Sequence, residues 1–134
     1  MTAPVLVPLA ADAQISLAER IYLAACLVVL GAVLVTLGRM GARRTLMPNA
    51  LFGIRTRRTM RSERVWYEVH AVAAPWMLTA GFVAFIGIIP VLLLREDFVF
   101  LTMLLSVGTS LVITVVGAVG AQRRVTAPER QADR

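Results

Sequence analysis

Three stretches of this chain carry no charged side chain, and they constrain its fold more than any other feature. They cover residues 21–38, 71–94 and 98–121, which are 18, 24 and 24 residues long. An α-helix rises about 1.5 Å per residue, so each stretch can cross, or nearly cross, a hydrocarbon layer of about 30 Å. Lipid offers backbone amides no hydrogen-bond partner, so a crossing segment must be helical. The sequence therefore predicts an all-α membrane protein with three transmembrane helices.

Composition supports this prediction. Hydrophobic residues make up 58% of the chain, above the roughly 45–50% of ordinary soluble domains. A soluble three-helix bundle would show polar faces with a 3.6-residue period, whereas residues 27–37 and 98–119 are apolar or small on all sides. We expect one membrane domain (1–134) with spans at about 17–39, 71–94 and 98–121, a loop at 40–70 and a tail at 122–134.

The charges indicate an orientation. All 14 basic residues are arginines. Eight of them fall between residues 39 and 70 and four after residue 121, leaving only Arg20 and Arg95 elsewhere. Because arginine-rich segments stay on the cytoplasmic side, the loop and the tail should be cytoplasmic and the amino terminus outside. The formal charge of +6 could suggest a nucleic-acid partner, but this distribution argues against one and favours contact with anionic lipid.

Local signals mark the ends of the first helix. Ser16 and Glu19 have the spacing of a capping box just before an apolar run, so the helix should begin near Leu17. Gly38 and Gly41 are good helix terminators and should end it. The residues before 16 and after 123 are expected to be irregular.

The loop should become helical again from about Thr59. On a helical wheel, one stripe holds Thr59, Ser62, Trp66, His70 and Ala73, and the opposite side holds Arg57, Arg61, Arg64 and Glu68. This pattern predicts an amphipathic juxtamembrane cytoplasmic helix before the second span. Pro75 either opens that span at its first turn or kinks a helix that runs on from Thr59.

Catalytic and metal-binding classes find little support. The chain has one histidine and one cysteine, so no pair of them has ligand spacing, and no motif of a hydrolase, metalloprotease or phosphate-binding loop occurs. The spans lack the ionisable residues that pumps and proton-coupled transporters place at mid-membrane. We therefore expect no enzyme activity, no cofactor and no metal.

The informative segment is residues 47–70, which read MPNALFGIRTRRTMRSERVWYEVH. It contains an ordered set of nine residues, which are Asn49, Gly53, Arg55, Thr56, Thr59, Ser62, Glu63, Trp66 and His70. This set resembles the pattern of the SdpI family, bacterial membrane immunity proteins against secreted peptide toxins. The resemblance covers about thirty residues together with one span before and two after. It corresponds to a short, single-module form, because many family members have additional amino-terminal spans.

The resemblance implies a multi-pass protein of the bacterial plasma membrane that works by binding. Its partners, besides the lipid bilayer, would be a secreted peptide toxin and a cytoplasmic repressor, so the implied functions are immunity and membrane signalling. The alternatives are a structural or accessory subunit of a larger membrane complex, packing through the Gly- and Ser-rich third span, or a transporter subunit. Self-association of the helices is a further expectation.

The matched residues each have a structural interpretation beside a functional one. Gly53 should supply a backbone conformation that a side chain forbids. Arg55 is either one more cytoplasmic charge or a fork-shaped donor to a carboxylate, a carbonyl or lipid phosphate, and Thr59 should cap the juxtamembrane helix. Trp66 either lies in the head-group layer or docks, with the rest of its stripe, against the ends of the spans. His70 is expected to be a satisfied hydrogen-bonding group before it is a pH switch.

Overall fold

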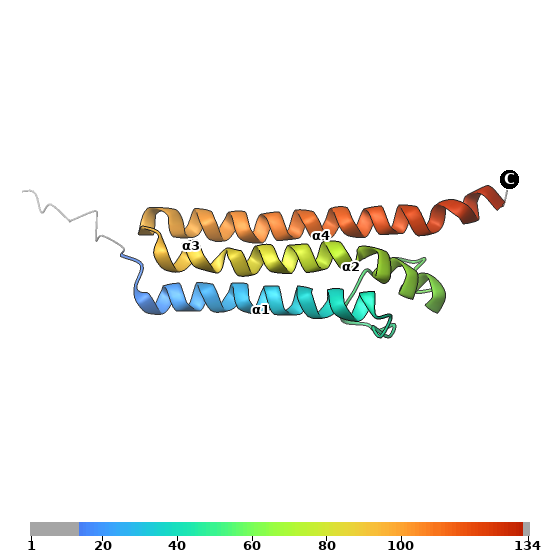
Figure 1. Ribbon diagram of the computed structural model, residues 1–134, viewed down its shortest axis with the longest axis horizontal. Helices are drawn as coiled ribbons and strands as arrows, with labels where there is room; N and C mark the ends of the chain where they lie inside the picture. Colours follow the sequence, from blue (N-terminus) through green and yellow to red (C-terminus); the bar gives the residue numbers. More distant parts are fainter. Residues whose placement is uncertain (1–13, 133–134) are drawn as a thin grey trace, which may run out of the picture.

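Three helical rods lie side by side in the computed structural model, which describes residues 14–132 and their side chains through Val125 (Figure 1). The helices are α1 (Leu17–Ala42), α2 (Glu63–Ile86), α3 (Ile88–Leu93) and α4 (Glu96–Ala132), with α3 continuing the line of α2. Three helical segments of the described chain are long and apolar enough to cross a membrane: Leu17–Ala42, Glu63–Leu93 and Glu96–Val125. The predicted all-α fold with three such helices is confirmed. Residues 1–13, most of the predicted irregular lead, lie outside the described residues.

The first helix begins and ends close to the predicted residues. The Ser16 hydroxyl accepts from the Glu19 amide at 3.2 Å, and the Glu19 carboxylate accepts from the Ser16 amide at 2.7 Å. Helix α1 continues past Gly38 and ends at Ala42, one residue after Gly41. A Cβ added to Gly41 would lie 2.8 Å from the backbone oxygen of His70. This glycine therefore allows α1 and α2 to approach closely, a role that its position near the helix end did not indicate.

The second helix begins later than predicted. Its N-cap is Ser62, whose hydroxyl accepts from the Val65 amide at 3.5 Å, so the prediction of Thr59 as the cap is wrong. The helix then runs without interruption past Pro75, and its axis bends along this stretch (Figure 1). Residues 63–70 are thus the first turns of α2, and a separate juxtamembrane helix is not confirmed.

The ends of the helices away from most arginines are tied together by side chains. Arg20 of α1 donates to the backbone oxygens of Val91 and Leu94, at 3.2 and 2.7 Å, where α3 ends. Glu96 at the start of α4 accepts from the Ile15 amide at 3.2 Å. Carbonyls at a helix terminus lack partners within the helix, so Arg20 stabilises this end of the bundle.

The fourth helix packs against α2 and leaves much of its surface exposed. The buried Ser110 hydroxyl donates to the Ala80 backbone oxygen of α2 at 2.9 Å, a bond between helices as expected for hydroxyls in membrane spans. Away from this contact, Phe100 and Leu104 are 68% and 71% exposed, as suits a lipid-facing surface. The helix extends to Ala132, so the prediction of an irregular segment after residue 123 is wrong up to that point.

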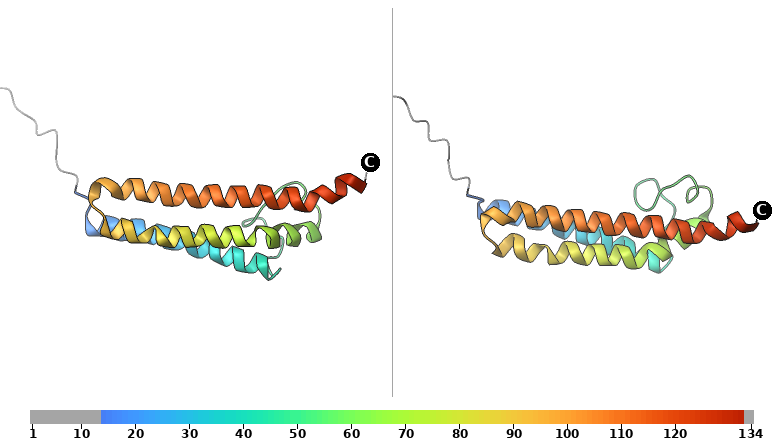
Figure 2. Two further views of the ribbon diagram at one scale, coloured as in Figure 1. Left: turned by 45° about the horizontal axis from the view of Figure 1, so that its top comes forward. Right: turned by 90° about the horizontal axis from the view of Figure 1, so that it is seen from above.

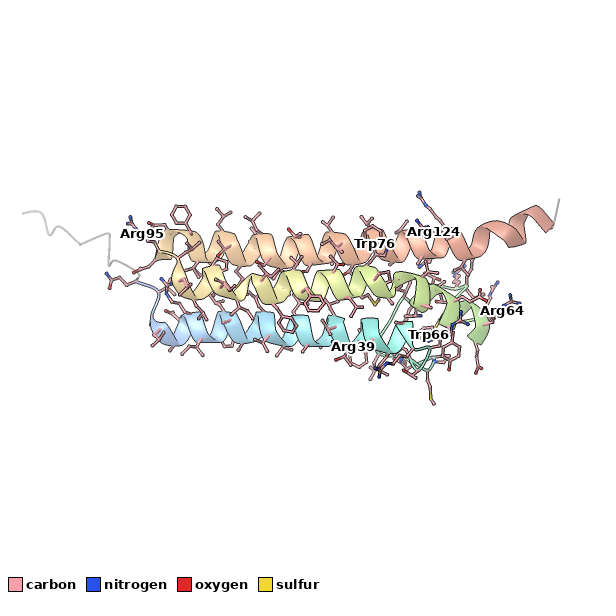
Figure 3. The ribbon with its side chains drawn as sticks, in the orientation of Figure 1. Arg39, Arg64, Trp66, Trp76, Arg95 and Arg124 are labelled. Atoms are coloured by element: carbon pink, nitrogen blue, oxygen red, sulfur yellow. The ribbon has the colours of Figure 1, made fainter. Side chains whose placement is uncertain are left out.

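Arginines gather at one end of the bundle, which we call the arginine-rich end. Figure 3 shows Arg39, Arg64 and Arg124 there, and Arg95 at the opposite end. The segment 43–62, which joins α1 to α2 and which we call the connector, lies at the arginine-rich end in both views of Figure 2.

The close approach of α1 to α2 is testable at Gly41. In Gly41→Ala the new methyl meets a backbone carbonyl, which cannot move without separating the helices. We expect a loss of about 1–3 kcal/mol of stability, the usual cost of overpacking. Gly108→Ala is the control, because a Cβ there meets no atom within 4 Å. Unfolding of the purified variants in mild detergent is the measurement, and equal stability of the two variants would contradict the close approach.

Candidate functional site

The connector begins with a turn organised by one asparagine. The Asn49 side-chain oxygen accepts from the amides of Leu51 and Phe52, at 3.0 and 2.7 Å, and its amide group donates to the Met47 backbone oxygen at 2.9 Å. An asparagine that bonds nearby backbone groups mimics a backbone turn. The Arg55 guanidinium donates to the backbone oxygen of Ala50 in the same turn. Of the acceptors considered from the sequence, it therefore bonds a carbonyl.

Gly53 follows this turn in a conformation that other residues rarely adopt. Its φ is +110°, and a Cβ at this position would lie 2.5 Å from His70 Nε2 and 3.1 Å from the Trp66 ring. Both the backbone angle and the lack of space require glycine. Gly53 therefore has the structural role that the sequence predicted, and it lets the connector backbone lie directly on two aromatic rings.

Those two rings come from the first turns of α2 and are buried under the connector. Trp66 and His70 are 0% and 1% exposed, and their ring centroids are 4.2 Å apart. Trp66 Nε1 donates to the backbone oxygen of Leu46 at 2.7 Å. The interpretation that docks this stripe on the rest of the protein fits the structure, because a fully buried ring cannot contact lipid head groups.

His70 bonds the connector through one nitrogen and its own helix through the other. Nε2 accepts from the Ile54 backbone amide at 2.8 Å, and Nδ1 lies 2.8 Å from the backbone oxygen of Trp66. An amide can only donate and a carbonyl can only accept. The bond network thus assigns the proton to Nδ1 and leaves Nε2 bare, which is one neutral tautomer. As expected, His70 is a satisfied hydrogen-bonding group.

Thr59 closes a second turn of the connector. Its hydroxyl is nearly buried, donates to the Ile54 backbone oxygen at 2.8 Å and accepts from the Thr56 amide at 2.8 Å. The Ile54 side chain points into a core with Val69 and Met77 of α2 and with Ala121 of α4. The Ile54 amide is therefore bonded to His70, its carbonyl is bonded to Thr59, and its side chain packs against α2 and α4.

Seven of the nine predicted residues build or clamp the folded connector, and two start the helix beneath it. The seven are Asn49, Gly53, Arg55, Thr56, Thr59, Trp66 and His70, and the two are Ser62, the N-cap, and Glu63, which is exposed in the first turn. Sequence reasoning missed Leu46 and Ile54, because both bond through backbone groups that leave no signal in the sequence.

An apolar groove of about 570 Å³ runs between α1 and the connector. Val33, Thr36, Leu37 and Met40 of α1 form one side, and Leu46, Asn49 and Phe52 are among the connector residues that form the other. Leu46 bonds Trp66, and Asn49 organises the first turn. The shape of the groove therefore depends on the same bonds that fold the connector.

The family model of the SdpI/YfhL protein family matches residues 45–120, more than half of the chain. The chain belongs to this family. The match begins in the connector, includes all nine predicted residues and continues into α4, so the suspected resemblance is confirmed. No curated protein and no solved structure matches the chain. Together with the three apolar helices, the family indicates a membrane protein.

The buried rings of this SdpI/YfhL family member are testable against a charged neighbour. Trp66→Ala leaves a cavity and an unpaired Leu46 carbonyl, so we expect a loss of about 3–5 kcal/mol. Arg61→Ala removes an exposed side chain and should change stability by less than about 0.5 kcal/mol. Unfolding in detergent compares them, and equal tolerance would show that the connector is not docked on Trp66.

The tautomer of His70 gives a prediction about pH. At neutral pH, nitrogen NMR of labelled protein should find the proton on Nδ1. Acid that protonates Nε2 replaces an acceptor with a donor facing the Ile54 amide, so the connector should become sensitive to protease as pH falls. A proton on Nε2 at neutral pH, with the connector intact, would rule out the bond to Ile54.

Proposed function

We propose that this protein protects a bacterial cell against a secreted peptide by holding a segment of that peptide within the membrane. The groove between α1 and the connector is the proposed binding site. Its lining is almost wholly apolar, and Val33 on its wall is 40% exposed. An apolar groove beside exposed apolar helix surface suits an amphipathic or apolar peptide that has already entered lipid.

The observation that carries the proposal is the position of Leu46. This residue lines the groove, and its backbone oxygen accepts the bond from Trp66 Nε1. A peptide in the groove must therefore contact the segment that is anchored to the buried rings. Immunity in this proposal is binding without catalysis: a peptide held in the groove is withheld from the rest of the bilayer.

The proposed orientation places the arginine-rich end in the cytoplasm and the amino terminus outside the plasma membrane. It rests on the concentration of arginines at that end and on the preference of such segments for the cytoplasmic side. Two exposed arginines of the connector, Arg57 and Arg61, would then face a cytoplasmic repressor. Signalling requires that the peptide bind two arrangements of the connector with different affinity.

A second candidate function, an accessory subunit of a larger membrane complex, is favoured by α4. Only 11% of an 18-residue apolar stretch of α4 is buried inside the protein, compared with 28% and 33% for the corresponding stretches of the other two candidate spans. A methyl group added at Gly108 or Gly120 of α4 would meet no atom within 4 Å, so another helix could approach there closely. Purification in mild detergent that recovers a stoichiometric membrane partner would support this function.

The groove can be tested with a pair of bulky substitutions on α1. Val33→Trp places a ring in the groove, whereas Val29→Trp places one on exposed surface one turn away, where the side chain is 62% exposed. Cells that produce equal membrane levels of each variant are challenged with the secreted peptides encoded beside the gene. We expect wild type and Val29→Trp to protect and Val33→Trp to lose protection.

Two other outcomes would count against the proposal. Equal protection by both variants would exclude the groove as the binding site. Survival that is the same with and without the wild-type protein, for every such peptide, would exclude immunity itself.

A further inference from the structure

A second cavity lies on the other side of the connector, against α4. Its volume is about 220 Å³, it opens to the surface, and it is lined by the turn at Thr56–Thr59, by α2 and by α4. The polar side chains on its lining include Arg58 of the connector and Arg123 of α4, with Thr56 and Gln122 beside them, while Val119 is among its apolar residues. This cavity does not belong to the groove described above, with which it shares no lining residue.

The charge around this cavity is one-sided. No carboxylate lines it. In the part of the chain whose side chains are described, the guanidinium groups of Arg58 and Arg123 make no ion pair and no hydrogen bond, while Arg64 nearby in sequence is paired with Glu68. Two cations that face one small cavity repel each other, so an anion between them would be bound by both.

The position along α4 indicates where that anion comes from. Arg123 follows directly on the uncharged stretch 98–121 and Gln122, and Val119, one turn earlier, is 43% exposed. The cavity therefore lies where the lipid-facing surface of α4 gives way to charge. In a bilayer this is the level of the head groups, where phosphate is the abundant anion.

We propose that this cavity binds the phosphate group of an anionic phospholipid between Arg58 and Arg123. Guanidinium groups present several N–H donors in a fixed plane and pair well with phosphate oxygens. One water needs only about 10–15 Å³ of such space, so a phosphate group fits in the cavity with water to spare. The acyl chains would lie along the exposed apolar surface of α4 near Val119.

Binding there would complete the attachment of the connector. The connector is hydrogen-bonded to α2 through Trp66 and His70, whereas it meets α4 through the apolar packing of Ile54 on Ala121. A phosphate held by Arg58 and Arg123 would join the connector to α4 through charge-assisted bonds as well. The site is independent of the proposed immunity function.

The chain offers matched controls for this site. Arg57 and Arg124 are the sequence neighbours of the two cavity arginines and do not line the cavity; Figure 3 shows Arg124 pointing away from the other helices. The four variants Arg58→Gln, Arg123→Gln, Arg57→Gln and Arg124→Gln each remove one positive charge. They differ only in whether that charge faces the cavity.

The experiment uses the full chain purified in mild detergent. Phosphatidylglycerol or phosphatidylcholine is added, bound lipid is counted by native mass spectrometry, and the unfolding temperature is measured with and without lipid. We expect wild type to prefer phosphatidylglycerol, because the choline cation of the other lipid is repelled. Arg58→Gln and Arg123→Gln should weaken its binding at least about tenfold, and the two controls less than about twofold. Unfolding temperatures without lipid should be equal, which shows that each variant is folded.

Three results would overturn the proposal. Equal weakening of phosphatidylglycerol binding in all four variants would indicate general surface attraction, and binding without preference between the two lipids would exclude selection of the anionic head group. Stabilisation by millimolar inorganic phosphate alone that equals the effect of phosphatidylglycerol would indicate a soluble anion as the ligand.

Discussion

The imidazole of His70 fixes an irregular connector to a membrane helix, and much of the arginine-rich end depends on it. The ring bonds the Ile54 amide on one side and the Trp66 carbonyl on the other. A buried amide left without a partner costs about 1–3 kcal/mol, so the connector cannot leave this ring without penalty. Gly53 gives the ring access to the backbone, and Gly41 lets α1 approach the carbonyl of the same histidine. Helix α1, helix α2 and the connector thus meet at one residue.

The connector in turn lines two different hollows in the surface. Toward α1 it completes an apolar groove, and toward α4 it completes a small cavity with two arginines. The first suits an apolar segment in lipid and the second suits an anionic group at the lipid surface. Both depend on the backbone between Leu46 and Thr59 keeping the arrangement that the buried rings impose.

Features set by the solvent or by neighbouring residues could be predicted from the sequence. The three spans follow from the cost of charge and of unpaired amides in lipid, and the start of α1 follows from the local bonds of Ser16 and Glu19. The nine-residue set indicated the family, and all nine residues lie within residues 45–120, which match the family model.

Features set by distant contacts could not be predicted. The sequence around Thr59 is typical of a helix cap, but its hydroxyl bonds the Ile54 carbonyl five residues earlier, which only a folded connector makes available. Trp66 has two interpretations from sequence, and the choice between them depends on a backbone oxygen 20 residues away. Gly41 has the local signature of a helix end, yet it packs against the backbone at His70.

Hydrogen exchange at the Ile54 amide, followed by NMR in lipid nanodiscs, tests most directly whether His70 holds the connector. The Ile54 amide is buried and bonded to the His70 ring, and such an amide exchanges only when its bond opens. Its exchange should therefore be at least about a hundredfold slower than that of the amide of Arg57, an exposed neighbour. His70→Phe keeps an aromatic ring but has no acceptor, and it should abolish this protection. An Ile54 amide that exchanges as fast as Arg57 in the wild-type protein would contradict the account.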